Sequence, residues 1–250
     1  MNKTKIDWAD MTWNPVTGCL NECPYCYAKK VARRFAPASA TMPGGKPRLH
    51  VLEERKNVGP FPCGFEPTFH RCRLAEPGRR KLPCNIFVCS MSDLFGAWVP
   101  TDWIVAVLDA CLAAPQHNYM FLTKNPQRYL DLDHLALLPR KRNFWYGTTV
   151  TAEKQPYFFS GEHNTFVSVE PMHGPLHGTD GILADWVIVG AETGKRDGKI
   201  LPRREWVLDL AEACKHADVP IFMKENLVKE GVLQPGDIIR RKPEGLKAWN

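Results

Sequence analysis

The sequence lacks any apolar run long enough to cross a membrane, and its first ten residues lack the apolar core of a secretory signal. That opening segment instead carries two lysines and two aspartates. We therefore expect a protein that does not enter a membrane and that works in the cytoplasm.

Two further features limit the possible folds and the possible roles of the cysteines. No Gly-x-Gly-x-x-Gly motif follows a predicted strand, so a dinucleotide-binding sheet lacks its fingerprint. The nine cysteines are odd in number, which in a cytoplasmic protein indicates metal ligands or buried thiols rather than disulfides. A chain of 250 residues can form one α/β barrel or two small domains, and we predict a single domain over residues 1–250.

Three cysteines stand close together near the start of the chain, in the spacing Cys-x3-Cys-x2-Cys. Cys19, Cys23 and Cys26 lie on a loop that can turn three thiolates toward one point, and soft thiolates select an iron–sulfur cluster or zinc. A structural zinc site would have a fourth ligand close by, and none follows here. The open coordination position suggests a reactive metal site, with a zinc knuckle and three unrelated thiols as the alternatives.

Regularly spaced apolar runs from residue 85 onward predict a mostly parallel sheet. The runs are continuous rather than alternating, as in strands covered on both faces, and helical patterns separate several of them. We predict an α/β fold, a partial or irregular parallel (β/α) barrel of about six to seven strands by this periodicity. The predicted strands are 12–17, 85–89, 119–122, 144–146, 165–169, 186–189 and 220–223.

Between the first and second predicted strands lie a helix and a long insert. Apolar residues recur at helical spacing over Tyr27–Phe35, directly after the cysteines. Residues 37–83 are rich in proline and glycine and predict a loop-rich insert with one short helix at Leu49–Lys56. A loop of this length in a compact domain is usually functional, and a lid over the site is one role open to it.

Polar and ionisable residues follow every predicted strand. In a parallel barrel these positions lie at one rim, where the chemistry is carried out. Lys124, Glu170, Glu192 and Lys224 are the candidate catalytic residues of this rim. Lysine–glutamate pairs that simply close the rim are the alternative, because pairing offsets the cost of burying a charge.

The cysteine motif resembles the signature of the radical S-adenosylmethionine (SAM) superfamily, in which an aromatic residue precedes the last cysteine. That residue is Tyr25 here. The resemblance implies that Cys19, Cys23 and Cys26 bind a 4Fe–4S cluster whose fourth iron binds the amino and carboxylate groups of SAM. It also implies a reducing electron donor of the flavodoxin or ferredoxin type.

A closer resemblance covers nearly the whole chain. Its segments are Ile6–Trp8, Thr12–Pro15, Gly18-Cys19, Ser90–Gly96, Leu122–Pro126, Ser168–Pro171, Trp186–Gly194 and Phe222–Lys224. These segments are similar to those of the phage and bacterial protein family named after phage gene products 37 and 68, which is regarded as radical-SAM-like.

By analogy with radical SAM barrels, the resemblance also implies a set of cofactor-binding residues. Ser92 and Asp93 stand where the SAM amino group binds, Thr148 and Thr149 stand near the ribose, and Tyr25 lies beside the adenine. One stretch departs from the common pattern, because Ser-Met-Ser-Asp replaces Gly-Gly-Glu-Pro after the second strand. That departure puts the contact to the amino group in question.

These features predict a radical SAM enzyme that cleaves SAM with a 4Fe–4S cluster and removes hydrogen from an unidentified substrate. A nucleic-acid base or nucleotide is one candidate, because the chain has a formal net charge of +6 and several basic clusters. The alternative is a non-enzymatic iron–sulfur or zinc-binding protein that binds nucleic acid. The identity of the bound metal, either iron with sulfide or zinc, distinguishes the enzyme from this alternative.

Six cysteines lie outside the motif. Three of them, at positions 89, 111 and 214, fall on predicted apolar surfaces and are expected to be core thiols. Cys63, Cys72 and Cys84 lie in or beside the insert with His70. A second metal site there is a further alternative, although their long spacing matches no common ligand pattern.

Overall fold

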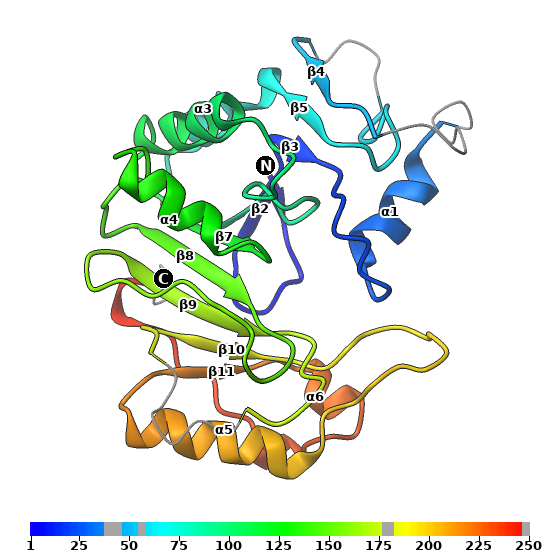
Figure 1. Ribbon diagram of the computed structural model, residues 1–250, viewed down its shortest axis with the longest axis vertical. Helices are drawn as coiled ribbons and strands as arrows, with labels where there is room; N and C mark the ends of the chain where they lie inside the picture. The colour runs from blue at the N-terminus through cyan, green and yellow to red at the C-terminus, as the bar shows by residue number, and fades with distance from the viewer. Residues whose placement is uncertain (38–46, 55–58, 177–182, 247–250) are drawn as a thin grey trace.

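In the computed structural model, which describes residues 1–37, 47–54, 59–176 and 183–246, the chain is built around one curved sheet (Figure 1). The sheet has eight strands in the order β1-β2-β6-β7-β8-β9-β10-β11. Neighbours from β2 to β11 pair in parallel, and β1 pairs with β2 in the antiparallel direction. The strands are β1 (Asn2–Lys3), β2 (Met11–Trp13), β6 (Asn85–Val88), β7 (Asn118–Thr123), β8 (Phe144–Thr149), β9 (Asn164–Val169), β10 (Val187–Val189) and β11 (Ile221–Met223).

This topology confirms the predicted α/β fold with a mostly parallel sheet. Each parallel strand lies beside the next strand of the sheet along the chain, as repeated β-α units with crossovers of one hand produce. The sheet has eight strands rather than six or seven because the antiparallel β1 extends one edge. Barrel closure is not seen, since no ladder in the described part of the chain joins β1 to β11.

Helices α3, α4 and α5 pack against the outer face of the sheet (Figure 1). Side chains of α3 and α4 share one buried cluster with β6, β7 and β8, and those of α5 share another with β9, β10 and β11. The helix predicted directly after the cysteines forms as α1. The helices are α1 (Tyr27–Phe35), α2 (Glu76–Arg79), α3 (Thr101–Leu112), α4 (Gln127–His134), α5 (Arg204–His216) and α6 (Asn226–Lys229), with 3₁₀ turns η2 (Arg71–Arg73), η3 (Pro235–Asp237) and η4 (Glu244–Leu246).

Aromatic side chains fill the inner face of the sheet. Phe87, Trp145, Phe166 and Phe222 come from β6, β8, β9 and β11 and share one buried cluster, separate from the clusters that the helices cover. Trp8, from the loop between β1 and β2, joins them, with its ring centroid 4.7 Å from that of Phe87 and 6.2 Å from that of Phe166. Alternation of side chains along each strand is what separates the inner cluster from the outer ones.

The region after α1 forms a second, smaller sheet. Its strands are β3 (Val16–Thr17), β4 (His50–Leu52) and β5 (Thr68–His70), in the order β3-β5-β4. β4 and β5 belong to the predicted insert, whereas β3 comes from the segment just before the cysteines. The insert is therefore tied by backbone hydrogen bonds to the chain that leads into the motif.

Two local predictions were wrong in this region. The predicted first strand at 12–17 is divided, because Asn14 and Pro15 separate β2 from β3 and the two strands join different sheets. Proline has no N–H to give to a ladder, so a strand breaks there readily. The short helix predicted from Leu49 is instead β4, paired in parallel with β5, and residues 55–58 of that prediction lie outside the described part.

The inner cluster generates a stability prediction at Gly147. Phe166 lies opposite Gly147 on the neighbouring strand, and a Cβ at Gly147 would lie 2.2 Å from its ring. We predict that Gly147→Ala lowers the free energy of unfolding by about 1–3 kcal/mol, because overpacking forces side chains and backbone to shift. Urea unfolding of the two proteins measures the difference.

Gly161→Ala is the matched control, because a Cβ at Gly161 would meet nothing within 4 Å. Its unfolding midpoint should stay close to that of the wild type. Equal midpoints for Gly147→Ala and wild type would show that the ring of Phe166 moves aside without cost.

Candidate functional site

A cavity of ≈ 350 Å³ opens at the carboxyl ends of the parallel strands. Trp8, Phe87 and Leu122 give it an apolar side that continues into the inner aromatic cluster. Much of the rest of its lining comes from the cysteine loop and from residues at or just after the ends of strands. Every predicted site residue except Thr148 lines this cavity, namely Cys19, Cys23, Tyr25, Cys26, Ser92, Asp93, Lys124, Thr149, Glu170, Glu192 and Lys224.

The cysteine loop enters the cavity through a tight turn at Gly18. Gly18 has a φ of 84°, in the left-handed region that favours glycine, and a Cβ there would lie 2.2 Å from the carbonyl oxygen of Glu66. Cys26 at the other end of the loop is the N-cap of α1, where its sulfur accepts the backbone N–H of Lys29 at 3.3 Å. The Cys26 sulfur thereby satisfies one of the backbone N–H groups that a helix leaves unpaired at its start.

Burial controls the protonation of the free thiols. It raises the pKa of Cys19 to about 12, and it raises the pKa of Cys23, where the nearby Lys124 ammonium acts in the opposite direction. Both thiols therefore hold their protons at neutral pH in the absence of a metal. Metal binding would replace those protons, because only thiolates are ligands.

Cys19, Cys23 and Cys26 line one cavity, and three thiolates are a donor set that an iron–sulfur cluster or zinc takes. Within the described ranges, no three His, Cys, Asp or Glu side chains gather closely enough to hold one metal ion. In a 4Fe–4S cluster each thiolate binds a different iron, so the sulfurs stand around the cluster rather than around one atom. Three cysteines that line one cavity are the ligands that such a cluster takes.

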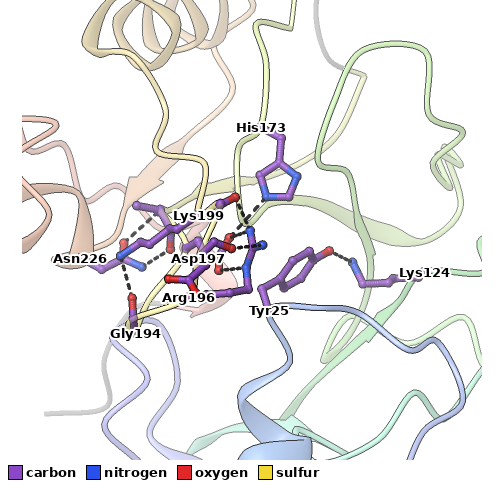
Figure 2. A network of polar contacts seen from close by, with 11 residues as sticks. Tyr25, Lys124, His173, Gly194, Arg196, Asp197, Lys199 and Asn226 are labelled. Carbon is purple, nitrogen blue, oxygen red and sulfur yellow. Dashed lines mark hydrogen bonds and ion pairs between the residues drawn. The ribbon is translucent and has the colours of Figure 1, made fainter.

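Tyr25 is held between a lysine and a histidine (Figure 2). The ammonium of Lys124 donates to the Tyr25 hydroxyl at 3.0 Å, and the ring of His173 stands edge-on to the Tyr25 ring at 5.4 Å. Burial is the main cause that raises the pKa of Tyr25, so the phenol is neutral at physiological pH. The aromatic residue of the motif is thereby fixed in the cavity wall.

The Asp93 carboxylate joins the cysteine loop to the ends of β6 and β7. One oxygen accepts the Thr123 hydroxyl at 2.7 Å and the backbone N–H of Phe95 at 3.2 Å. The other accepts the side-chain amide of Asn21 at 2.9 Å and the backbone N–H of Lys124 at 3.0 Å. Asp93 is 4% exposed, and these donors from the protein itself already satisfy both of its oxygens.

Ser92, the other residue expected at the SAM amino group, is also committed to the protein. Its hydroxyl donates to the carbonyl of Val16 at 3.1 Å, and its backbone pairs with Gly18 in an isolated parallel bridge. Ser92 and Asp93 thus line the cavity while they position the loop that carries the cysteines. This arrangement shows what the Ser-Met-Ser-Asp sequence contributes in place of the common Gly-Gly-Glu-Pro stretch.

Glu170 and Lys224 form an ion pair in the cavity wall. Gly190, between them, leaves the room they need, since a Cβ there would lie 3.0 Å from Cδ of Lys224 and 3.4 Å from Cδ of Glu170. Both side chains are partly exposed, so the pair remains reachable from the cavity.

Glu192 is buried and paired with an arginine that the sequence patterns did not single out. Nε and Nη2 of Arg196 donate to its two oxygens at 2.7 and 2.9 Å, and Nε2 of His173 lies 3.9 Å away (Figure 2). The Arg196 contact lowers the pKa of Glu192, which stays ionised at neutral pH. Arg196 lies in a loop and His173 in an irregular segment, where no periodic pattern marks them.

The two threonines at the end of β8 lie on different sides. Thr149 lines the cavity, whereas Thr148 is fully buried and its hydroxyl accepts the backbone N–H of Phe158 at 3.1 Å. Successive residues of a strand point to opposite faces, so adjacent hydroxyls cannot both face one ligand. Thr148 therefore does not line the cavity, and the role expected for it near the ribose stays a prediction.

The remaining cysteines are dispersed. Cys84 is buried with its sulfur 3.4 Å from Nδ1 of His117, and Cys72 lines a second cavity of ≈ 670 Å³ beside the insert. His70 is buried against the hydroxyl of Thr17 at 2.9 Å. Cys63, Cys72 and Cys84 therefore form no three-ligand metal group within the described residues.

Comparison with known proteins decides the family. The model of the family described as "Protein of unknown function (DUF5131)" matches residues 3–234. The chain belongs to the DUF5131 family. No curated protein matches the sequence significantly. The narrower grouping named after phage gene products 37 and 68 stays a prediction.

Solved structures show a related fold. A mutant of spore photoproduct lyase with a cysteine replaced by serine is similar at a TM-score of 0.51 and 12% sequence identity, covering 89% of this chain and 78% of that chain. A double mutant of the same lyase with bound AdoMet and dinucleoside spore photoproduct matches at a TM-score of 0.47 and 12% identity, covering 90% and 59%. The first similarity shows the fold alone. In the described part of this DUF5131 chain, no helix has the length and apolar character to cross a membrane.

The contacts of Asp93 generate the second prediction. Asp93→Asn keeps the shape of the side chain but turns an amide toward donors that need an acceptor. We expect the free energy of unfolding to fall by about 2–3 kcal/mol, because a charged acceptor is lost from a buried site. Chemical denaturation followed by circular dichroism measures this loss.

Asp109→Asn, on the exposed side of α3, is the control and should change stability by no more than about 0.5 kcal/mol. If both variants unfold at the wild-type midpoint, the carboxylate of Asp93 does not hold the loop.

Proposed function

We propose that this protein is a radical SAM enzyme, and the observation that carries the proposal is the lining of one cavity. The three cysteines of the Cys-x3-Cys-x2-Cys motif share that cavity with Lys124, Glu170, Glu192 and Lys224. These residues come from the ends of separate elements of a parallel sheet, the place where α/β enzymes of this architecture carry out their chemistry. The resemblance of the motif to the radical SAM signature supplies the reaction class.

Cys19, Cys23 and Cys26 would hold the 4Fe–4S cluster. When bound, the cluster supplies the electron that cleaves SAM, and the carbon radical so formed takes hydrogen from the substrate. The chain itself supplies position and exclusion of water, since the apolar side of the cavity leads into the buried aromatic cluster.

The charged rim supplies partners for the polar groups of SAM and the substrate. Lys124 presents an ammonium beside Tyr25, and the Glu170–Lys224 pair presents both signs of charge to the same space. Glu192 is already neutralised by Arg196, so its contribution is to fix the loop after β10 rather than to offer a free carboxylate. Thr149 is the strand-end hydroxyl in reach of a ribose, and Tyr25 provides an aromatic surface for the adenine.

A non-enzymatic metal protein is the second candidate, and the satisfied ion pairs favour it. Such pairs, Glu170–Lys224 and Glu192–Arg196, are expected where the charged residues of the rim only stabilise the fold and bind no ligand. Such a protein would hold zinc or iron through the cysteines without binding SAM. The identity of the metal and the binding of SAM distinguish the two candidates.

The cluster is the subject of the third prediction. Protein reconstituted anaerobically with iron and sulfide should bind about four iron atoms per chain, the content of a 4Fe–4S cluster. Changing Cys19, Cys23 and Cys26 together to Ala should abolish the bound iron and its visible absorption. Iron analysis and electron paramagnetic resonance of the reduced protein make the measurement.

The double variant Cys63→Ala/Cys72→Ala is the control, because both residues lie outside the cavity and are only partly buried. It should retain the full iron content. Stoichiometric zinc, with no iron after reconstitution, would instead establish the non-enzymatic candidate.

The fourth prediction separates a ligand-binding rim from a rim of structural pairs. Lys124→Met and Glu170→Gln should each leave the iron content intact and lower SAM affinity or 5′-deoxyadenosine formation by at least about tenfold, equivalent to about 1.4 kcal/mol. Calorimetry with SAM, and product release with dithionite as reductant, give the two readouts.

Lys215→Met and Glu205→Gln, on the exposed surface of α5, are the matched controls. If the rim variants lose stability but keep SAM binding and turnover, the charges close the rim and touch no ligand. Failure of the reduced, cluster-loaded wild type to bind or cleave SAM would reject the radical SAM assignment itself.

A further inference from the structure

Helix α1 presents a basic surface that the proposed chemistry does not use. Its buried residues are the small Ala28 and Ala32, so little of the helix is covered by the rest of the protein. Lys30, Arg33 and Arg34 are exposed, and none of them has an ion-pair partner among the described residues. Three like charges held within five residues without carboxylates attract a polyanion.

The same helix carries an apolar stripe beside these charges. Tyr27, Val31 and Phe35 recur every four residues, which places them on one side of the helix. They are 49%, 36% and 54% exposed, respectively, unusual for large apolar side chains that follow one another. Exposed aromatic faces next to cations are the combination that binds unpaired bases together with their phosphates.

The stripe adjoins both of the cavities described above. Tyr27 and Val31 line the second cavity of ≈ 670 Å³, and Tyr27 also lines the cavity of the cysteines. The Tyr27 hydroxyl donates to the carbonyl of Ser90 at 2.6 Å, and Ser90 lines both spaces as well. A chain bound along α1 would therefore pass the entrance of the candidate active site.

Further positive charge lies beside α1, in the loop between β10 and α5 (Figures 1 and 2). The ammonium of Lys30 would be 3.8 Å from a Cβ placed on Gly194, and Lys199 donates to the Gly194 carbonyl at 3.1 Å. Lys199 is paired with Glu230 and Arg196 with Glu192, so these two extend the positive region less than α1 does. The two carboxylates of the second cavity are Glu54 and Glu76, the latter ion-paired with the N-terminal amine.

From these contacts we infer that α1 binds a single-stranded nucleic acid and brings one of its nucleotides to the cysteine cavity. Lys30, Arg33 and Arg34 hold phosphates, and Phe35 and Tyr27 stack with bases. A duplex would fit less well, because its bases are already stacked on each other and cannot use the exposed rings. The inference names the class of substrate that the enzyme would act on, and in this respect it rests on the proposed function.

The test is a titration of fluorescently labelled single-stranded DNA and RNA oligonucleotides of mixed sequence with the full-length protein. Wild type should bind at low salt, with an affinity that falls steeply as salt rises. Lys30→Glu/Arg33→Glu/Arg34→Glu should lower the affinity at least tenfold and flatten the salt dependence by about two in log–log slope, as expected for three lost contacts to a single strand. The neutral variant Lys30→Gln/Arg33→Gln/Arg34→Gln repeats the test if charge reversal impairs folding.

The charge-matched control is Lys81→Glu/Lys141→Glu/Arg142→Glu. These three residues are exposed and precede β6 and β8, at the opposite end of the strands from the cavity. Each triple reversal takes the formal net charge from +6 to zero, because every replacement changes it by two. Equal loss of binding in both triple variants would show attraction by overall charge and overturn the assignment of α1. Absence of binding by the wild type at low salt would overturn it as well.

Stacking is tested separately with Phe35→Ala. This change should weaken single-strand binding at least fivefold and leave the salt dependence unchanged, because stacking carries no counterion release. Phe159→Ala, at a residue that is 45% exposed elsewhere on the surface, is the control and should bind as wild type does. Equal or tighter binding of a duplex, with no effect of Phe35→Ala, would refute the preference for single strands.

Oligonucleotide binding is measured on the purified protein before and after reconstitution. It is a different readout from iron content and SAM cleavage. Binding without SAM cleavage would reject the enzyme and keep the surface, whereas SAM cleavage without binding would reject the surface and keep the enzyme.

Discussion

The Asp93 carboxylate is the contact on which the candidate site most depends. It accepts four hydrogen bonds, from Asn21 of the cysteine loop and from Phe95, Thr123 and Lys124 at the ends of two strands. A loop that leaves a sheet has few contacts of its own to fix it, so a buried charged acceptor with four donors supplies the position that the cysteines need. Because the backbone N–H of Lys124 donates one of these bonds, the same carboxylate also positions the residue whose ammonium contacts Tyr25.

Burial and charge are balanced differently at the two sides of the cavity. One side is apolar and continuous with the aromatic cluster around Trp8, which excludes water and strengthens every electrostatic interaction nearby. The other side carries charges that would be costly there without partners. Glu192 is paired with a bidentate arginine, and Glu170 is paired with Lys224. Lys124 is the remaining rim cation, and its ammonium contacts Tyr25.

Helix α1 connects the cysteine loop to the outside of the protein. The motif cysteine Cys26 caps the N-terminus of this helix, and the exposed side of the helix carries the basic and aromatic residues discussed above. Ala28 and Ala32 are the buried residues of this helix. This small contact leaves most of its surface available to a partner. The position of the motif cysteine Cys26 and that of the proposed nucleic-acid-binding surface are therefore set by one element.

The sequence by itself determined the features that depend on near neighbours in the chain. Cysteine spacing, the helix after it and the apolar runs follow from residues a few positions apart, and the common rim follows because parallel strands end at one edge of a sheet. Only the tertiary structure decided what depends on strand orientation and distant contacts. The pleat turned Thr148 away from the cavity and Thr149 into it, Pro15 sent β3 into a second sheet, and the fold brought the ring of His173 to that of Tyr25. These outcomes depend on which faces of the elements meet after folding, and no local sequence pattern predicts those contacts.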